Sequence, residues 1–201
     1  MKVTLVKHGK TKYNVEGRRQ GKTTNLSLCE VGKQEIIKLK NEIANEFDIC
    51  ISSPLKRAYE TAQLIYSDKK IIKNHLLSEY DFGELEGIPF SMPVERFPNN
   101  RIEVYNGIEF LIPNKGESFN NLVKRCEKFI SYLKKNFEKN SNILIITHGT
   151  NFEILKALFE NKKWHTYLGQ VNKFNGFCSL NLVILKDENN SNSARKNNIQ
   201  H

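Results

Sequence analysis

The chain has 201 residues, of which 39% are hydrophobic and 26% charged, and its formal net charge is +9. This length suits one domain of ordinary to slightly large size, and the composition can supply a buried core. No run of about 18 apolar residues is present, which argues against a membrane span. The N-terminus also lacks the apolar core and cleavage site of a signal peptide. We therefore expect a cytoplasmic protein with no membrane partner.

The cysteines and the surplus of positive charge bear on whether the protein binds metal, performs redox chemistry or binds nucleic acid. The four cysteines are scattered and form no CxxC pair, so we expect reduced thiols and no zinc or redox motif. Lysines are spread along the whole chain, without a basic run interleaved with aromatic residues, which disfavours nucleic acid as a partner. The charge fits the attraction of an anionic substrate, or a lysine-rich surface that aids solubility.

The first third of the chain alternates apolar strands with amphipathic helices. Ser27 and Glu30 have the spacing of a capping box, and Ser53-Pro54 has the composition of a helix cap followed by a first helical residue. In chain order, the pattern predicts a strand over 2–7, a loop over 9–27, a helix over about 28–46, a strand over 48–52 and a helix to about 66.

The remaining chain continues this alternation around one long segment, 80–116, rich in Gly, Pro and aromatic residues. Irregular segments of that length are uncommon unless functional, so we predict an insert that serves as a lid. Its aromatic residues either wall a substrate pocket or attach the insert to the core: Phe82, Phe90, Phe97, Tyr105 and Phe110. Around it, the pattern predicts a strand at 71–72, a helix over 117–137, a strand over 143–147, a helix over about 150–160, a strand over 179–186 and a disordered tail over 187–201.

Strands that alternate with helices predict an α/β fold. We expect a three-layer sandwich in which a mainly parallel central sheet is covered by helices on both faces. Residues 1–186 are predicted to form a single domain, with 80–116 as its insert.

Two histidines stand at the ends of predicted strands, and each is followed by glycine. His8 ends the strand over 2–7, and His148 ends the most apolar strand of the chain. Ligands of open α/β sheets bind beyond the carboxyl ends of the strands, and a following glycine lets the chain turn sharply. Arg57 lies in the first turn of a predicted helix aimed at the same edge. Each alone could be an ordinary structural residue, but their convergence indicates a site for phosphate.

The residue types fit phosphoryl transfer. A neutral imidazole is a competent nucleophile toward phosphorus, and nearby cations would keep it neutral by lowering its pKa. Cleavage of a phosphate monoester further needs positive charge around the oxygens and an acid for the leaving alcohol. Either His8 or His148 could be the nucleophile, and Arg57 is suited to clamp the oxygens.

Six motifs occur in an order that resembles the histidine phosphatase superfamily, the phosphoglycerate mutase-like group. Among its members the chain is most similar to small bacterial phosphatases such as the α-ribazole phosphatase group. The motifs are Lys7-His8-Gly9 with Thr11 and Asn14; Gln20-Gly21 with Leu28 to Gly32; Ser53 to Ala62; Leu77 to Gly87; Gly116-Glu117-Ser118; and Thr147-His148-Gly149.

The resemblance implies a role for each matched position and implies no metal or other cofactor. His8 would become phosphorylated, Arg57 and His148 would hold the phosphoryl oxygens, and Glu79 would protonate the leaving group. Within the same turn, Glu86-Gly87 is expected to shape the loop. The expected site therefore comprises catalytic His8, Arg57, Glu79 and His148, phosphate-binding Lys7 and Asn14 beside Arg57 and His148, and substrate-binding Gln20 and Gly21.

One position departs from the family pattern, because Lys7 stands where the family has arginine. Lysine keeps the charge but loses the bidentate fork. Three outcomes are open: Lys7 holds phosphate at a reduced rate of turnover, Arg18 or Arg19 compensates, or the site binds phosphate without turnover.

We therefore predict a metal-independent phosphomonoesterase for a small soluble phosphate ester. A phosphoglycerate mutase-like phosphoryl transferase and a non-turnover phosphate-ligand binder are the alternatives. The short insert has few basic residues to hold a substrate carboxylate, which favours the hydrolase. The oligomeric state is open, with a homodimer as one option.

Overall fold

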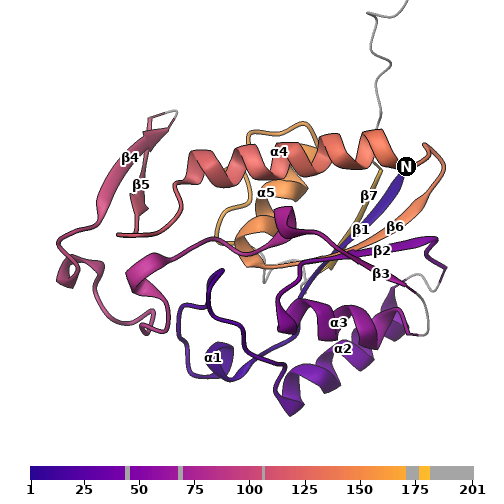
Figure 1. The fold of residues 1–201 in the computed structure, drawn as a ribbon, viewed down its shortest axis with the longest axis horizontal. Helices are drawn as coiled ribbons and strands as arrows, with labels where there is room; N and C mark the ends of the chain where they lie inside the picture. Colours follow the sequence, from indigo (N-terminus) through magenta and orange to yellow (C-terminus); the bar gives the residue numbers. More distant parts are fainter. Residues whose placement is uncertain (44–45, 68–69, 106, 171–176, 182–201) are drawn as a thin grey trace, which may run out of the picture.

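Five strands form the central sheet of the protein, in the order β3-β2-β6-β1-β7 (Figure 1). The structure is a computed structural model that describes residues 1–43, 46–67, 70–105, 107–170 and 177–181. All neighbouring strands are parallel except β7, which runs antiparallel to β1 at one edge. The strands are β1 (Lys2–Lys7), β2 (Ile49–Ser52), β3 (Ile71–Lys73), β6 (Asn142–Thr147) and β7 (Phe177–Asn181).

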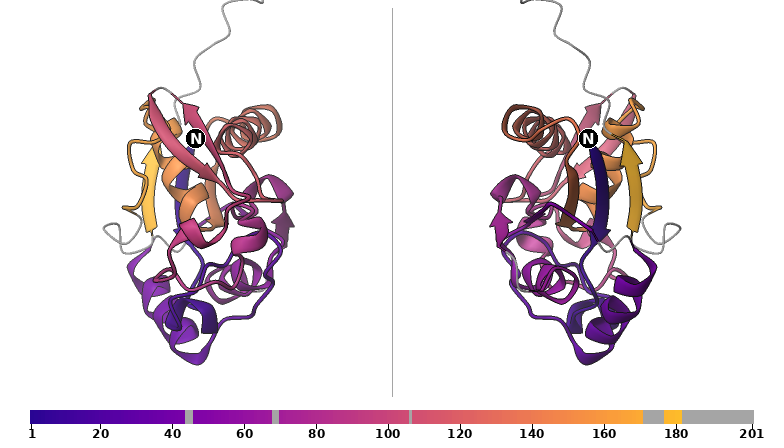
Figure 2. Two further views of the ribbon diagram at one scale, coloured as in Figure 1. Left: turned by 90° about the vertical axis from the view of Figure 1, so that its left-hand side faces the viewer. Right: turned by 90° about the vertical axis from the view of Figure 1, so that its right-hand side faces the viewer.

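Helices cover both faces of this sheet, as Figures 1 and 2 show. One face packs against α2 (Glu30–Glu42) and α3 (Lys56–Ile65), and the other against α4 (Phe119–Asn136) and α5 (Gly149–Phe159). Strand β6 is buried on both sides because its side chains alternate: Ile143 and Ile145 join the α4/α5 core, and Leu144 and Ile146 the α2/α3 core. The predicted three-layer, mainly parallel α/β fold is therefore confirmed.

The strand register brings distant parts of the chain to one edge. In the parallel pair of β1 and β6, Lys7 lies opposite Thr147, so His8 and His148 leave the sheet side by side. The amide of His8 donates to Thr147 O (3.0 Å), and that of Ser53 to Ile146 O (3.0 Å). Three adjacent strands thus deliver His8, His148 and Ser53 to the same carboxyl edge.

The predicted helix caps were wrong in two places. Helix α2 begins at Glu30, and its N-cap is Cys29 without a side-chain bond, not Ser27. Tertiary contacts fix the chain just before the helix instead: Leu28 N donates to the Glu60 carboxylate (2.8 Å) and Cys29 N to Lys10 O (2.9 Å). Helix α3 likewise begins at Lys56, two residues beyond Pro54.

Two segments expected to be irregular contain regular structure. The 9–27 loop includes the short helix α1 (Lys12–Val15), capped reciprocally by Thr11 and Asn14. The 80–116 insert contains the antiparallel hairpin of β4 (Arg101–Tyr105) and β5 (Ile108–Ile112). The sequence carried a hairpin signal here, an Asn-Gly dipeptide at 106–107 between two alternating runs. Short 3-10 turns occupy His75–Leu77, Gly83–Leu85 and Val94–Arg96.

The C-terminal part of the prediction is only partly covered by the structure. Strand β7 begins at Phe177, two residues earlier than expected. Residues 182–186 of the expected strand and the expected tail over 187–201 lie outside the described residues. Within the described ranges, no helix has the length and apolarity that a membrane crossing requires.

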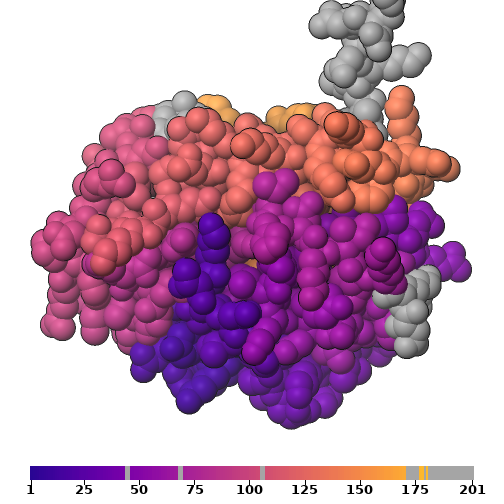
Figure 3. All heavy atoms as spheres, viewed as in Figure 1, coloured from indigo at the N-terminus to yellow at the C-terminus, as the bar shows by residue number. Residues whose placement is uncertain are grey.

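The N-terminal loop and the insert lie against each other on one face of the molecule (Figure 3). Four backbone hydrogen bonds join them: Arg19 N to Ile88 O (2.9 Å), Lys22 N to Tyr80 O (3.1 Å), Gly87 N to Arg19 O (2.8 Å) and Phe90 N to Gly17 O (2.8 Å). This contact closes one wall of the pocket described below.

Close backbone packing at Gly32 generates a stability prediction. A Cβ atom at this position in α2 would lie 2.1 Å from Lys10 O. Alanine would gain about 1 kcal/mol of helix propensity, but the backbone must shift to admit the methyl group. We expect Gly32→Ala to destabilise the protein by about 1–3 kcal/mol in urea unfolding. The exposed Lys38→Ala in the same helix is the control, and a Gly32→Ala variant as stable as the parent would contradict the proposed clash.

Candidate active site

Two imidazoles and one guanidinium meet at the carboxyl edge of the sheet. The ring centroids of His8 and His148 are 5.0 Å apart, with the rings tilted by 59°. Arg57 Nε donates to His8 Nε2 (3.2 Å). His8 is 6% exposed, and Arg57 and His148 are fully buried. The convergence predicted from the sequence is therefore present in the geometry.

Hydrogen bonds determine which nitrogen of His8 carries the proton. Nδ1 lies 2.7 Å from Gly9 O, which only accepts, so the hydrogen is assigned to Nδ1. Nε2 then has a lone pair, which accepts from Arg57. Burial, and then the charge of Arg57, hold the pKa of His8 well below 6.5. The imidazole is therefore neutral, and its lone pair is on Nε2, where it accepts from Arg57 Nε.

His148 has one bonded and one unbonded ring nitrogen. Its Nε2 lies 2.8 Å from Ser53 Oγ, which also accepts from Leu55 N (3.3 Å). The serine hydrogen can therefore point to Nε2, which places the ring hydrogen of neutral His148 on Nδ1. Nδ1 is buried and has no hydrogen-bond partner among the described residues. It is thus a donor suited to an anionic oxygen.

Arg57 is held by carbonyl oxygens of the N-terminal loop. Nη1 donates to Thr24 O (2.6 Å) and Nη2 to Gly21 O (3.0 Å). Glu86 fixes this loop, because its carboxylate accepts from Thr23 N (3.0 Å) and from the Thr24 hydroxyl. The prediction that Glu86 shapes the loop agrees with these bonds. Burial lowers the pKa of Arg57 to about 10, which leaves it protonated at neutral pH.

Gly21 is required by the close approach of the chain around Arg57. A Cβ atom there would lie 2.6 Å from Tyr80 O and 2.5 Å from Glu86 Oε1. Its carbonyl faces Arg57, and Gly21 does not line the pocket. In this structure Gly21 therefore contacts Arg57, and it does not face the pocket in which a substrate would bind.

Glu79 and Lys7 bring a carboxyl group and an amine to the same pocket. Glu79 is 6% exposed and accepts from Tyr80 N (2.8 Å). Burial raises its pKa above 4.5, against the opposing effects of the Tyr80 amide and Arg57. Burial also lowers the pKa of Lys7, against the attraction of Glu79 and Glu153. A carboxyl group with a raised pKa beside cations is a suitable proton donor.

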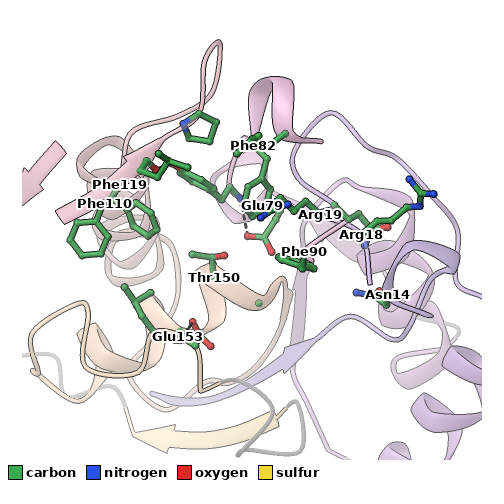
Figure 4. Close-up of a pocket in the computed structure, with 18 of the residues that line it drawn as sticks. Asn14, Arg18, Arg19, Glu79, Phe82, Phe90, Phe110, Phe119, Thr150 and Glu153 are labelled. Carbon is green, nitrogen blue, oxygen red and sulfur yellow. Dashed lines mark hydrogen bonds between the residues drawn. The ribbon is translucent and has the colours of Figure 1, made fainter. Parts of the chain in front are cut away.

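These side chains open into a pocket of about 650 Å³ (Figure 4). Of the predicted site residues, Lys7, His8, Asn14, Gln20 and Glu79 line it, whereas Arg57 and His148 are fully buried and contact His8. Asn14 Oδ1 accepts from Thr11 N (3.0 Å), and Gln20 Oε1 accepts from the Thr11 hydroxyl (2.8 Å). The two cations considered as substitutes for the family arginine, Arg18 and Arg19, line the pocket as well.

A metal ion would have few ligands in this arrangement. Within the described ranges, no group of three or more His, Cys, Asp or Glu side chains could hold one.

Comparison with known proteins assigns the chain to a family. The family model of the histidine phosphatase superfamily (branch 1) matches residues 3–197. The uncharacterized phosphatase PhoE of Bacillus subtilis is 31% identical over 157 residues, which cover 76% of this chain and 74% of that protein. The chain belongs to the histidine phosphatase superfamily.

Other members differ in the reaction that their names describe. A 2,3-bisphosphoglycerate-dependent phosphoglycerate mutase of Bartonella bacilliformis is 26% identical over 167 residues, 79% of this chain and 81% of the mutase. The crystal structure of a candidate α-ribazole-5′-phosphate phosphatase from Escherichia coli aligns with a TM-score of 0.69 and 25% identity, covering 83% of this chain and 82% of that one. The resemblance identified from six motifs is confirmed.

Sequence reasoning missed Arg125, which supports the family's Gly-Glu-Ser element and Glu79. Its Nε and Nη2 form a bidentate pair with Glu117 (3.0 and 2.8 Å). Its Nη1 donates to Leu76 O (2.7 Å) and Ser78 O (2.6 Å), and Nη2 to Glu79 O (3.4 Å). Arg125 therefore fixes the backbone that presents Glu79. No local pattern suggests this pairing, because Glu117 precedes the N-cap of α4 and lies eight residues before Arg125, beyond the spacing of helical neighbours.

The Glu117–Arg125 pair generates a second stability prediction. Both side chains are largely buried, 12% and 13% exposed. Arg125→Met would leave the Glu117 charge unpaired and would remove the hydrogen-bond donor to three backbone carbonyls. We therefore expect the free energy of unfolding to fall by about 3–5 kcal/mol. Adding Glu117→Gln should recover part of that loss. A double-mutant cycle by urea unfolding measures it, and strict additivity of the two changes would contradict the coupling.

Proposed function

We propose that this member of the family hydrolyses a small soluble phosphate monoester through a phosphohistidine on His8. The observation that carries the proposal is the state of His8. Its Nδ1 is bonded to Gly9 O, its Nε2 carries the lone pair, and it lines a pocket that also contains Lys7 and Glu79. Attack on a phosphate dianion requires a nucleophile that is neutral and has positively charged side chains close to it.

The reaction proceeds in two balanced steps. The hydrogen bond from Arg57 Nε to His8 Nε2 breaks, and the freed Nε2 lone pair attacks phosphorus. The ester P–O bond breaks, and protonated Glu79 gives its proton to the departing alcohol oxygen. Glu79, now a carboxylate, then takes a proton from water as that water attacks the phosphohistidine phosphorus. The P–N bond breaks, inorganic phosphate leaves, and both His8 and Glu79 return to their starting protonation states.

The neighbouring residues stabilise the charge of the phosphoryl oxygens in this proposal. Arg57 uses three of its N–H donors on His8, Gly21 and Thr24, which leaves others of its five for phosphate. His148 offers its buried Nδ1. Lys7 and Asn14 approach from the pocket side. Because Lys7 lacks a planar fork, we expect slower turnover than arginine would give, by about 10²–10³-fold at most.

Two other functions are supported by specific observations. The mutase relatives favour return of the phosphoryl group to a second oxygen of the substrate. Lys7, in place of arginine, favours a binder of phosphate ligands without turnover. The hydrolase is preferred because, among the described residues, the side of the pocket opposite Asn14 is lined by Phe110, Phe119 and Glu153 and by no lysine or arginine that could hold a substrate carboxylate. We further propose that the protein acts in the cytoplasm, without a nucleic-acid or membrane partner.

Trapping of the intermediate tests the proposal. Brief incubation with ³²P-labelled phosphate ester, without added metal, should leave an acid-labile, base-stable label on the protein, and inorganic phosphate should accumulate. His8→Ala should abolish both signals, with His75→Ala, on a 3-10 turn outside the pocket, as the matched control. Label transferred to an added alcohol and not to water indicates the mutase. Absence of label that Lys7→Arg restores indicates the binder.

The pKa of Glu79 predicts the basic limb of the pH profile. The acid must be protonated, so kcat/KM should fall as pH rises through the raised pKa of Glu79, and should fall again in acid as His8 becomes protonated below its lowered pKa. Glu79→Gln should lower kcat for an alkyl phosphate by about 10²–10⁴-fold. The loss should be smaller for p-nitrophenyl phosphate, whose leaving group needs little protonation. An unchanged basic limb in Glu79→Gln would assign the proton to another group.

A further inference from the structure

The wall of the pocket away from the cations is built from aromatic side chains. Phe110 and Phe119 line it, opposite Arg18 (Figure 4), and Phe82, Leu111 and Leu168 line the same pocket. Resting on the proposed phosphatase function, we infer that the alcohol of the substrate carries an aromatic or similarly bulky apolar group that packs against these rings. The substrate class is thus a phosphate monoester with an uncharged apolar tail.

The rings of this wall are held in place before any ligand arrives. The centroids of Phe110 and Phe119 are 4.7 Å apart, and that of Tyr80 lies 4.9 Å from Phe119. Trp164, only 5% exposed, packs behind both phenylalanines at 5.1 and 5.7 Å. These aromatic residues come from the insert, from α4 and from the segment after α5. A wall fixed by mutual packing loses little conformational freedom when a ligand binds.

Charge is distributed unevenly around the pocket (Figure 4). Asn14 and Arg18 lie on one side, and Phe110, Phe119 and Glu153 lie on the other. An alcohol extending from His8 toward the phenylalanines therefore meets apolar rings and the 4%-exposed carboxyl side chain of Glu153. A carboxylate on this tail would lose its hydration among the apolar rings, and the neighbouring Glu153 carboxyl, which accepts from Gly169 N (2.9 Å), offers it no positive charge. The arrangement selects against anionic tails.

The exposed Phe90 and the volume of the pocket are both consistent with a substrate whose alcohol carries a bulky apolar group. Phe90 lines the pocket yet is 61% exposed, and the Arg19 guanidinium lies over its ring at 5.1 Å. A volume of about 650 Å³ lies within the range of drug-sized ligand sites. A three-carbon phosphate ester would leave most of the phenylalanine surface uncovered.

Matched substrates test the inference without altering the leaving-group chemistry. We expect kcat/KM for 2-phenylethyl phosphate to exceed that for ethyl phosphate by roughly 10- to 100-fold, as burial of one phenyl ring predicts. We expect 3-phosphoglycerate to fall below ethyl phosphate. Phe110→Ala and the exposed Phe90→Ala should each reduce the phenylethyl-to-ethyl ratio. Phe97→Ala, in the same insert but outside the pocket lining, should leave the ratio unchanged.

Binding of phosphonates separates this inference from the proposed reaction. Calorimetry with 2-phenylethylphosphonate and ethylphosphonate reports the same preference whether or not turnover occurs, and we expect a similar ratio of dissociation constants. Equal affinity for both phosphonates would overturn the aromatic wall as a substrate site, even if phosphohistidine forms. A retained preference without phosphohistidine would overturn the phosphatase and leave the inference intact.

Discussion

The site depends on a fully buried guanidinium, Arg57, whose partners are two backbone carbonyls and a neutral imidazole. Among the described residues, no carboxylate lies within ion-pair distance of it. A buried charge paired only with dipoles is costly unless a counter-ion joins it. A phosphate dianion would supply that counter-charge. Burial, and after it the charge of the same guanidinium, lowers the pKa of His8 and of His148, so Arg57 both attracts the anion and helps to keep the nucleophile neutral.

The surrounding structure serves to keep this charge in place. Glu86 does not meet Arg57 directly but holds the loop whose carbonyls do, and Gly21 allows that loop to pass close to Tyr80. Arg125, paired with Glu117, likewise holds the backbone of the segment that carries Glu79. Glu86, Gly21 and Glu117, which belong to the family motifs, thus act on the site through the residues that would contact the ligand. Their substitution would loosen the geometry of the site through the backbone.

The two ends of the pocket are suited to different parts of a substrate, one to the phosphate group and the other to the alcohol. The sheet edge offers His8 and Lys7, features that suit any phosphate monoester, whereas the far wall consists of aromatic residues drawn from the insert and the neighbouring helices. The insert hairpin contributes Phe110 through β5, and Trp164 packs behind it. The chemistry therefore resides in the sheet, and the choice of alcohol in the segments attached to it.

The sequence alone determined the fold class and the convergence of His8, Arg57 and His148, because apolar runs and strand ends are local patterns that parallel pairing brings to one edge. It also determined Glu79 as the acid candidate, through motif resemblance. The helix start at Glu30, the Arg125 clamp and the arrangement of the phenylalanines were decided only by the tertiary structure. Of the insert aromatics, Phe82, Phe90 and Phe110 line the pocket, Phe97 does not, and the Tyr105 side chain lies outside the described residues. Each of these outcomes rests on contacts between segments far apart in the chain, which local periodicity and propensity do not encode.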